Sequence, residues 1–338
     1  MNRRLPAEWE PQSAVQLSFP HAGTDWADML DVVLPVFVTI AETIARFERV
    51  LVVCSDAAAA RQLLRNIPAE RLVLAEIPSN DTWARDHGGI TILENGEPLM
   101  LDFVFNGWGL KFPADKDNLI TGELSRRGVF RAPYVPGGLA LEGGGIESDG
   151  QGTLLTTTEC LLSPNRNPHL NQSQTEEALK TLFGLSRVLW LHHGFLEGDD
   201  TDSHIDTLAR FCSPDTIAFV QCNDPHDPHF EALQQMEAEL RAFTQADGQP
   251  YRLVPLPWPD ACFAADGHRL PATYANFLII NGAVLVPLYG VAQDEAAMRI
   301  FTALFPDREV IGINCRPLIE QHGSLHCITM QYPAGVIN

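Results

Sequence analysis

Cys327 is the residue of this chain best placed for nucleophilic chemistry. It follows Gly323 and Ser324, which predict a turn, and it stands among strand-forming residues. A thiol presented at such a turn can reach into a pocket and attack a bound substrate. Three upstream segments supply the other reactive groups: Trp-Ala-Arg-Asp at 83–86, Leu-Glu-Gly-Gly-Gly at 141–145 and an acidic stretch at 199–206. One thiol, one imidazole and several carboxylates are the groups needed to hold a planar cation and attack its central carbon.

The triplet His204-Ile205-Asp206 places an imidazole and a carboxylate two residues apart. In an extended segment, residues two apart face the same side. We therefore expect both side chains to enter one pocket, with Ile205 packed behind them. The acidic residues at 199–202 also fit a plainer interpretation, in which they cap the start of a helix. The His-x-Asp spacing favours the pocket.

Two further acids stand close to glycines. Asp86 comes shortly before Gly88 and Gly89 and is expected to project from the end of a strand, although a turn-forming Asp fits the same pattern. Glu142 precedes three glycines, where backbone can approach a ligand closely, and a plain Gly-rich turn fits equally well. Trp108 could wall a pocket for a cation or an aliphatic chain, or it could belong to the core.

Several common catalytic motifs are missing. The sequence has no Gly-x-Ser-x-Gly elbow, no Gly-x-Gly-x-x-Gly after a strand, no Walker A loop and no His-Glu-x-x-His. Zinc would require His192, His193 and His204 with a carboxylate, and their spacing is not that of a zinc site. We therefore expect neither a metal nor a cofactor.

The amino-acid composition restricts the kinds of molecule that this protein can be expected to bind. The chain has 338 residues and a formal net charge of −20, which disfavours nucleic-acid binding because phosphate recognition requires a basic face. The acidic field would attract cationic substrates, although it could equally serve solubility alone. No apolar run reaches the length of a membrane span, and the N-terminus lacks the apolar region of a signal peptide. Seven widely spaced cysteines contain no Cys-x-x-Cys pair. We therefore expect a cytoplasmic protein.

Short apolar, β-branched runs alternate with helical patterns, which predicts an α/β protein. The predicted strands cover residues 50–54, 72–77, 100–105, 153–157, 188–191, 217–221, 277–280, 284–287 and 309–313. The predicted helices cover residues 26–47, 57–66, 118–127, 174–183, 230–243 and 295–305. Pro35 is expected to bend or delay the first helix, and Gly184 to end the fourth. No linker divides the chain, so residues 1–338 are expected to form one domain. Periodicity alone permits a doubly wound sheet or a circular arrangement of α/β units.

Together, the candidate segments resemble the agmatine deiminase and bacterial-type peptidylarginine deiminase family of guanidine-modifying enzymes. They occur in family order, and Pro-Ala-Glu-Trp-Glu-Pro at 6–11 fits as well. The matching segments are 83–86, 102–109, 141–144, 159–168, 200–206, 274–277 and 326–329. The chain departs from the family pattern at Ser203, at Gly89 and at 321–324. These positions are expected to shape the outer pocket, and none of them is a candidate catalytic residue.

The resemblance implies the pentein fold, an α/β propeller of five pseudo-symmetric ββαβ-type units around a central active site. It also implies Cys327 as the nucleophile and His204 as the general acid and base. Asp86 and Asp206 would bind the guanidinium nitrogens, and Glu142 would hold His204. The expected substrate-binding residues are Trp83, Trp108, Asp81 and Asn276.

Elementary chemistry agrees with these roles. Two carboxylates can grip a planar guanidinium in a bidentate manner and orient its central carbon for the thiolate. His204 would protonate the leaving ammonia, and water would hydrolyse the covalent intermediate. The same carboxylates are expected to raise the pKa of Cys327 in the empty site, until a cationic substrate or His204 offsets them.

The expected activity is agmatine deiminase, which yields N-carbamoylputrescine and ammonia for putrescine biosynthesis. The alternatives are a peptidylarginine deiminase, a non-catalytic guanidine- or polyamine-binding protein and a metal-dependent amidinohydrolase. A pocket for agmatine should place acidic or aromatic groups at the distal amine, for which Asn80, Asp81, Trp83 and Trp108 are candidates. A pocket for arginine should offer a cation, and Arg85 or Arg166 could serve. A homo-oligomer is compatible with the sequence.

Overall fold

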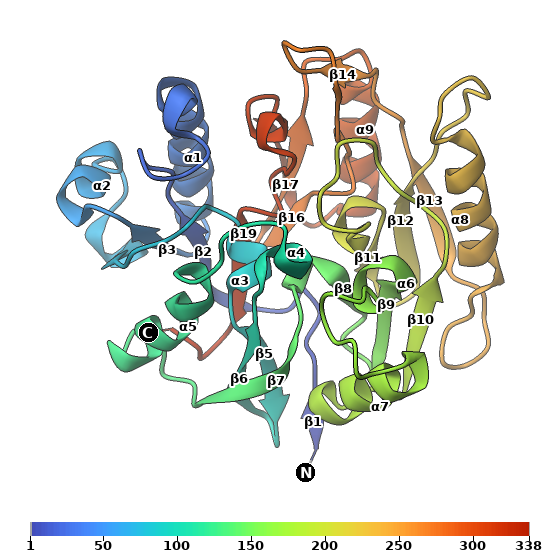
Figure 1. Ribbon diagram of the computed structural model, residues 1–338, viewed down its shortest axis with the longest axis horizontal. Helices are drawn as coiled ribbons and strands as arrows, with labels where there is room; N and C mark the ends of the chain where they lie inside the picture. Colours follow the sequence, from blue (N-terminus) through green and yellow to red (C-terminus); the bar gives the residue numbers. More distant parts are fainter. Residues whose placement is uncertain (1, 338) are drawn as a thin grey trace.

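The computed structural model describes residues 2–337, which form five sheets arranged in a ring and one separate two-stranded hairpin (Figure 1). Each of the five sheets contains an antiparallel pair of strands, followed by a strand that returns parallel to the second of them. This ββαβ order repeats around the ring. The alternation in the sequence therefore belongs to a circular arrangement of α/β units, not to a doubly wound sheet.

The first sheet joins the two ends of the chain. Its strands are β19 (Thr329–Pro333), β2 (Gln12–Ser18), β3 (Arg49–Cys54) and β4 (Leu72–Glu76). β19 pairs antiparallel with β2, so that Thr329 lies opposite Leu17, and β2 runs parallel to β3. Because Cys327 stands just before β19, this pairing closes the ring next to Cys327.

The other four sheets follow in chain order. The second contains β1 (Arg3–Arg4), β5 (Ile90–Glu94), β6 (Glu97–Val104) and β7 (Tyr134–Ala140). The third contains β8 (Ile146–Ser148), β9 (Thr153–Thr157) and β10 (Arg187–Leu191). The fourth contains β11 (Ala209–Ser213), β12 (Thr216–Val220) and β13 (Arg252–Leu256). The fifth contains β16 (Leu278–Ile280), β17 (Ala283–Leu288) and β18 (Glu309–Asn314), and the hairpin is β14 (Cys262–Phe263) with β15 (Arg269–Leu270).

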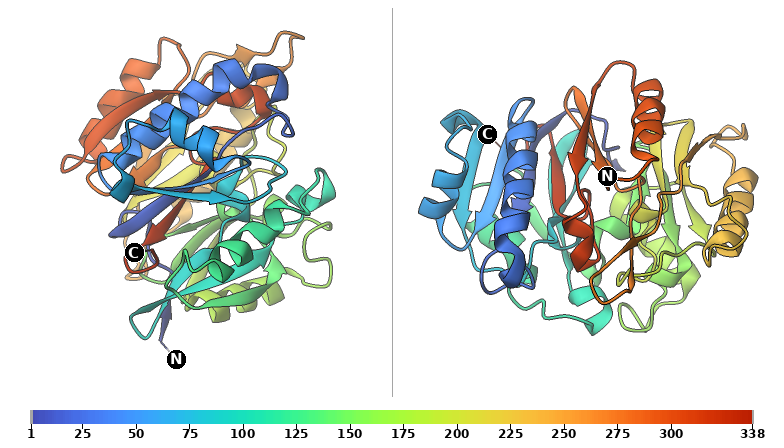
Figure 2. Two further views of the ribbon diagram at one scale, coloured as in Figure 1. Left: turned by 90° about the vertical axis from the view of Figure 1, so that its left-hand side faces the viewer. Right: turned by 90° about the horizontal axis from the view of Figure 1, so that it is seen from above.

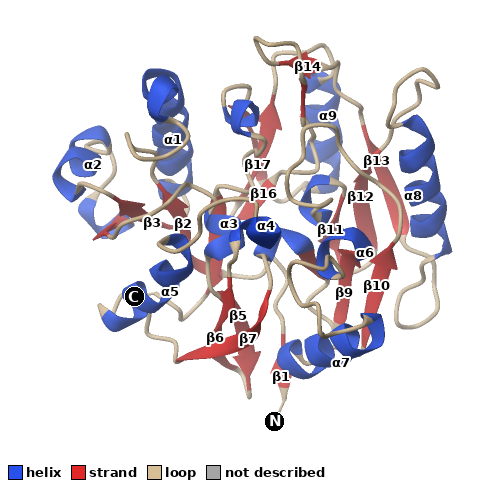
Figure 3. Ribbon diagram, in the orientation of Figure 1, coloured by secondary structure: helices blue, strands red, loops and turns tan. Residues whose placement is uncertain are grey.

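The longer helices lie outside the ring, whereas short helical turns lie near its middle (Figures 2 and 3). The outer helices are α1 (Leu30–Ala45), α2 (Ala57–Leu63), α5 (Ile120–Arg126), α7 (Gln172–Phe183), α8 (Phe230–Ala242) and α9 (Asp294–Leu304). The short ones are α3 (Ala84–His87), α4 (Gly107–Leu110) and α6 (Thr158–Leu161). Among the described residues, no helix has the length and apolar character of a membrane-crossing segment.

The strand β3 shows why the apolar runs in the sequence are nearly continuous. Val50 and Val52 belong to one cluster of buried side chains, and Leu51 and Val53 belong to a second cluster on the opposite face. Successive residues of a strand point to opposite faces, so a strand buried on both sides must be apolar at every position. Such runs are the clearest strand signals in the chain.

All nine predicted strands and all six predicted helices are present, with ends within about four residues of those expected. Pro35 lies inside α1, which begins at Leu30. Gly184 ends α7 in the left-handed conformation, with φ of 70°. The prediction missed the other strands, which include β2 and β19 as well as the interrupted strand β7, whose sequence contains Pro136 and two glycines.

Candidate active site

The thiol of Cys327 lies in a turn immediately before β19 and is almost completely buried. Its Sγ atom is 3.9 Å from Oδ2 of Asp206 and 3.3 Å from Nδ2 of Asn276. The side-chain oxygen of Asn276 accepts hydrogen bonds from the backbone amides of His326, at 2.8 Å, and Cys327, at 3.3 Å. Asn276, expected to bind substrate, therefore lies beside the Cys327 thiol and holds the turn that carries it.

His204 lies between two carboxylates. Its Nδ1 atom is 3.6 Å from Oδ1 of Asp86, and its Nε2 atom is 3.6 Å from Oε2 of Glu142. Neither ring nitrogen has a hydrogen-bond partner at these distances, although the ring is fully buried. The imidazole is thus held electrostatically, and both nitrogens are free to exchange a proton during a reaction.

The expectation that residues 204–206 are extended was wrong. Residues Ile205–Thr207 form a 3-10 turn, and His204 stands at its N-terminal end. The preceding loop turns sharply, because Asp202 and Ser203 have φ of 67° and 61° and the Asp199 carboxylate accepts the amide of Ser203. His204 and Asp206 nevertheless lie in one site, because the turn directs both side chains toward Gly144.

Gly144 is the point at which the reactive side chains meet. A Cβ atom at this position would lie 2.6 Å from Nδ1 of His204, 2.8 Å from Oδ1 of Asp86 and 3.2 Å from Oδ2 of Asp206. Real Cβ atoms do not approach other atoms this closely, so only glycine fits. The run of three glycines after Glu142 therefore allows close approach to three catalytic candidates, beyond simply forming a turn.

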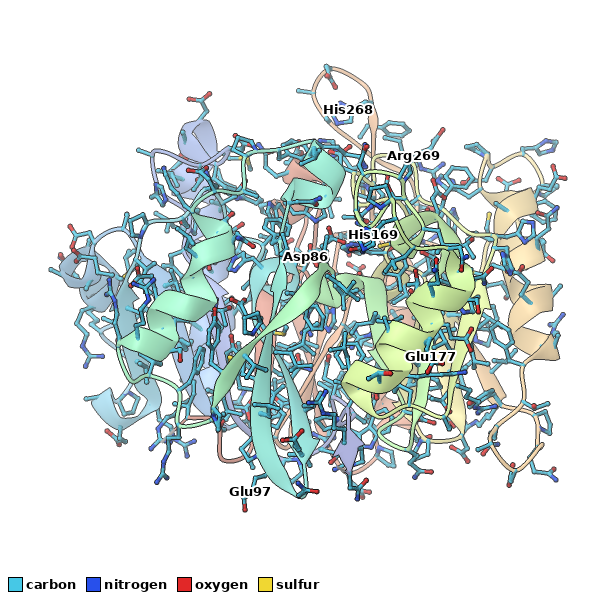
Figure 4. The ribbon with its side chains drawn as sticks, turned by 60° about the horizontal axis from the view of Figure 1, so that its bottom comes forward. Asp86, Glu97, His169, Glu177, His268 and Arg269 are labelled. Carbon is cyan, nitrogen blue, oxygen red and sulfur yellow. The ribbon has the colours of Figure 1, made fainter. Side chains whose placement is uncertain are left out.

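The sequence led us to expect Asp86 at the end of a strand. It lies instead in the one-turn helix α3. Its two oxygens accept hydrogen bonds from the amide of Gly144, at 3.1 Å, and from Nε1 of Trp108, at 2.9 Å. Trp108 thus orients Asp86 as well as lining the cavity. Figure 4 shows Asp86 near the middle of the molecule, where the units of the ring converge.

Burial and neighbouring charges set the protonation of the site. Burial, together with Asp206 and Asp86, raises the pKa of the Cys327 thiol well above its ordinary value. Burial likewise raises the pKa of Asp86 to about 6, although His204 opposes the rise. Burial disfavours a charged His204, but Asp86 and neighbouring groups outweigh it and raise the pKa of His204 well above its usual range. These shifts favour the neutral thiol of Cys327 and the protonated imidazole of His204.

Glu142 is held by Arg166. The Nε atom of Arg166 donates to Oε2 of Glu142 at 2.7 Å, and its Nη1 atom donates to Asp202 at 2.6 Å. Burial opposes the charge of Glu142, but His204 and Arg166 outweigh it and lower its pKa. Glu142 is therefore anionic and directs its charge toward His204.

Glu142, Cys160 and His204 come close enough together to suggest a metal site in the described part of the chain. The guanidinium of Arg166 already occupies Oε2 of Glu142 and would repel a second cation. We assign this group to an ion pair and not to a metal. The zinc site considered from the sequence does not assemble either, because His192 and His193 are exposed and His193 pairs with Glu239.

A cavity of about 170 Å³ leads to Cys327 and Asp86. Three of the predicted substrate-binding residues, Asp81, Trp83 and Trp108, line it. Trp83 packs against the backbone of Gly323, where a Cβ atom would lie only 2.0 Å from its ring. The other lining residues are Gly23, Asp25, Asn80, Phe112, Pro113, Asp117, Asp200, Thr201, Gln321 and His322.

Sequence reasoning missed several residues of the site. Asp25 and Asp117 carry no spacing signal in the sequence, so only the folded chain brings them to the cavity, whereas Asp200 lies in the acidic stretch already noted at 199–206. Arg166 was considered as a partner for a substrate carboxylate, but it pairs with Glu142 and Asp202.

Comparison with known proteins agrees with this geometry. The profile of the Porphyromonas-type peptidyl-arginine deiminase family matches residues 4–333. A solved structure from Porphyromonas gingivalis, provisionally called an arginine deiminase, is 56% identical, covers 99% of this chain and 100% of its own, and has a TM-score of 0.95. A cysteine-to-serine variant of the C. jejuni agmatine deiminase, solved with substrate bound, is 37% identical, covers 98% and 96% of the two chains, and has a TM-score of 0.91. A Vibrio parahaemolyticus protein provisionally named agmatine deiminase is 37% identical over 358 residues, covering 98% and 96% of the two chains.

Five ββαβ units around a buried thiol, imidazole and carboxylates define a protein of the pentein fold. The chain belongs to the Porphyromonas-type peptidyl-arginine deiminase family, which it matches over almost its whole length. Both the predicted fold and the family resemblance are thereby confirmed.

Proposed function

We propose that this protein is an agmatine deiminase, a hydrolase that acts on the C–N bond of a linear amidine. It converts agmatine to N-carbamoylputrescine and ammonia and so serves putrescine biosynthesis. One observation carries the choice of substrate: the cavity at Cys327 is lined by acidic and aromatic side chains and, among the described residues, by no Lys or Arg. Agmatine carries a second cation at its far end, and such a lining favours a cation there.

Neither arginine considered from the sequence is available to bind a substrate carboxylate. Arg85 is buried beneath the site, with its Nη2 atom 3.7 Å from Oε2 of Glu8. Arg166 is engaged by Glu142 and Asp202. The carboxylate of free arginine would therefore enter an acidic cavity without a partner, which opposes its binding.

Asp81 is the best placed of the acidic residues to meet the distal amine. Asp117 accepts the amides of Asn80, at 2.6 Å, and Asp81, at 3.1 Å, and so fixes their loop at the cavity wall. The Asp81 carboxylate accepts only the amide of Thr82, at 2.8 Å, among the hydrogen bonds of at most 3.5 Å in the described structure. It can therefore bind an ammonium, with Trp83 beside the aliphatic chain.

The reactive end of the substrate would lie between Asp86 and Asp206. Oδ1 of Asp206 is buried without a hydrogen-bond partner, whereas its Oδ2 faces the thiol. A guanidinium supplies N–H groups for this free oxygen and for Asp86. Its positive charge also offsets the two carboxylates, so the pKa of Cys327 falls when substrate binds and the thiolate can form.

The reaction then needs only groups of this site. When substrate binds, the Cys327 thiol loses its proton to solvent, and its thiolate forms a C–S bond to the central carbon. Protonated His204 gives its proton to the departing amino group as the C–N bond breaks, and the ammonia takes up a proton from solvent. A water then adds to the thiouronium carbon and gives one proton to neutral His204. As the C–S bond breaks, the remaining hydroxyl proton passes to the sulfur, which releases the neutral urea product and restores the thiol. Agmatine and one water thus yield N-carbamoylputrescine and ammonium, and Glu142 favours His204 in its protonated form.

A peptidylarginine deiminase is the second candidate, because the matching family profile carries that name. Ammonia release should be measured with agmatine, free arginine and arginine-containing peptides, with Cys327→Ser as the inactive control. We expect kcat/KM for agmatine to exceed that for arginine by about two orders of magnitude or more, since polar groups left unpaired discriminate strongly. Turnover of peptides with no turnover of agmatine would overturn the assignment.

Two other classes of protein, a non-catalytic binding protein and a metal-dependent amidinohydrolase, can be tested separately. A non-catalytic binding protein would bind agmatine in a calorimeter without releasing ammonia over hours. A metal-dependent amidinohydrolase would lose activity on exhaustive chelation and regain it with manganese, whereas we expect full activity after chelation. We also propose that residues 1–338 form one catalytic domain. The location that we propose for the protein is the cytoplasm.

A further inference from the structure

His326, the neighbour of the nucleophile, bridges two buried carboxylates. Its Nδ1 atom is 2.8 Å from Oδ2 of Asp206, and its Nε2 atom is 2.7 Å from Oε2 of Glu8. Both distances are those of hydrogen bonds, and an ionised carboxylate can only accept. Both contacts are satisfied together when each ring nitrogen carries a proton, so that a cationic ring lies between two anions.

Glu8 reaches this position from the segment before β2, far from the catalytic residues in sequence. Its Oε1 atom accepts the amide of Ile279 at 2.7 Å, and its Oε2 atom lies 2.9 Å from Nη2 of Arg210. Burial opposes the charge of Glu8, but Arg210 and His326 outweigh it and lower its pKa. Glu8 is therefore a fixed anion behind His326.

This arrangement decides which oxygen of Asp206 is free. Oδ2 is engaged by His326, whereas Oδ1 is buried and has no partner. Burial would raise the pKa of Asp206, but the bond from His326 outweighs it and lowers the pKa. The other charged or titratable groups around Asp206 and His326 are Glu8, Arg85, Asp86, Glu142, Glu147, His204, Arg210 and Cys327.

We propose that His326 and Glu8 are positioning residues, which keep Asp206 ionised and present its Oδ1 atom to the substrate from behind the nucleophile. The inference rests on the proposed function in one respect, namely that Asp206 binds the guanidinium. It assigns a role to the N-terminal segment, which otherwise takes no part in the chemistry. The pair touches neither substrate nor reacting atoms and acts through Asp206.

Glu8→Gln preserves the shape of the side chain and removes its charge. His326 then keeps Asp206 as its one anionic partner, Asp206 is oriented less firmly, and its pKa rises. Asp86, whose pKa is about 6, already sets the acid limb of the kcat/KM profile, so the change must be measured as KM. KM for agmatine should rise about 10-fold or more, because Asp206 binds the guanidinium less well, and kcat should fall by a smaller factor.

Glu147→Gln is the matched control. Glu147 is also buried and also pairs with Arg210, but it makes no hydrogen bond to His326. Both variants should lower the thermal stability, because each removes a buried partner of Arg210. Only Glu8→Gln should raise KM for agmatine by a larger factor than it lowers kcat. Equal rises of KM in the two variants, or no rise in either, would overturn the proposal. If Glu8→Gln does not fold, His326→Gln takes its place with the same expected rise of KM.

A second measurement requires no turnover. In ligand-free enzyme carrying ¹⁵N-labelled histidine, both ring nitrogens of His326 should show hydrogen-bonded protons, assigned by their loss in His326→Gln. An unprotonated ring nitrogen would overturn the positioning role even if agmatine is hydrolysed normally. Conversely, a doubly protonated ring in a protein that does not hydrolyse agmatine would contradict the proposed function and leave the bridge intact.

Discussion

The Sγ atom of Cys327 lies 3.9 Å from Oδ2 of Asp206, so the nucleophile faces a carboxylate proposed to hold its substrate. Two negative charges at this distance repel each other, and burial strengthens the repulsion. The site therefore resists forming a thiolate while it is empty. A bound cation between the two groups reverses that balance, which makes the nucleophile dependent on the charge of its substrate.

The first prediction concerns selective labelling. All seven thiols are buried, and the pKa of Cys327 is raised well above its ordinary value. A neutral alkylating agent such as iodoacetamide should therefore react slowly with Cys327. A haloacetamidine, which carries a planar cation, should label Cys327 first, and agmatine should protect it. Mass spectrometry of the labelled peptides measures which thiol reacts first. Labelling of Cys54 or Cys262 to the same extent as Cys327 would contradict the assignment.

Cys327→Ser should lower kcat by about four orders of magnitude or more, as expected for the loss of a covalent nucleophile. The thermal unfolding temperature should change little, because the substitution alters one atom in a buried turn. Agmatine should still bind in a calorimeter, since both carboxylates are intact. A variant with wild-type turnover would exclude Cys327 as the nucleophile.

The next prediction tests recognition of the distal amine. Burial and the nearby Asp25 carboxylate raise the pKa of Asp81 to about 7. As pH falls through this value Asp81 takes up a proton, so KM for agmatine should rise. Asp81→Asn should remove this dependence and lower kcat/KM for agmatine by about 10- to 100-fold, the worth of a hydrogen bond to a charged group. An unchanged ratio of agmatine to arginine activity would show that Asp81 does not bind the amine.

Gly144→Ala should inactivate the enzyme without unfolding it. The added methyl group would lie 2.6 Å from Nδ1 of His204 and 2.8 Å from Oδ1 of Asp86, so one of these side chains must move. Misplacing a reactive group by about 1 Å costs roughly 10²-fold in rate. Gly122→Ala in α5 is the control, because its Cβ would meet only the Tyr134 ring, at 3.3 Å from Oη. Similar losses in both variants would indicate a general packing defect.

The buried carboxyl group of Glu48 should make the stability of the folded protein depend on pH. Burial raises its pKa from 4.5 to about 7, although Asn281, Arg308 and Arg71 oppose the rise. Between these values the folded state holds a proton that the unfolded chain has released, so stability falls as pH rises. The slope from this group reaches about 1.4 kcal/mol per pH unit. Glu48→Gln should therefore stabilise the protein more at pH 8 than at pH 5, and an equal change in denaturant midpoint at both would contradict this.

The positions of nine strands and six helices, and a set of candidate reactive side chains, could be predicted from the sequence. Strands such as β17 are apolar at every position, because both of their faces are buried, and this pattern is visible in any single chain. Strands such as β7 were missed, because glycine and proline mask a strand that neighbouring sheet residues stabilise. Local propensity is a weak guide where tertiary contacts supply the energy.

For the candidate active site, too, the residues could be predicted from the sequence and their geometry could not. Cys327, His204, Asp206, Asp86 and Glu142 lie in segments that stand out in sequence and resemble a family in order. Their local geometry did not follow, since His204 precedes a 3-10 turn and Asp86 lies in a helical turn. The first error came from inferring side-chain direction from period-two spacing, which holds only for extended chain. The second came from taking the glycines after Asp86 as the sign of a strand end.

By itself, the sequence determined an acidic α/β protein with a cysteine, a histidine and carboxylates suited to guanidinium chemistry. The tertiary structure decided which of them act together, and it added Glu8, Arg166 and Gly144, whose roles depend on contacts across the ring. The reason is physical. Side-chain chemistry belongs to each residue, whereas pKa, hydrogen-bond partners and close approach depend on distances that only closure of the five units establishes.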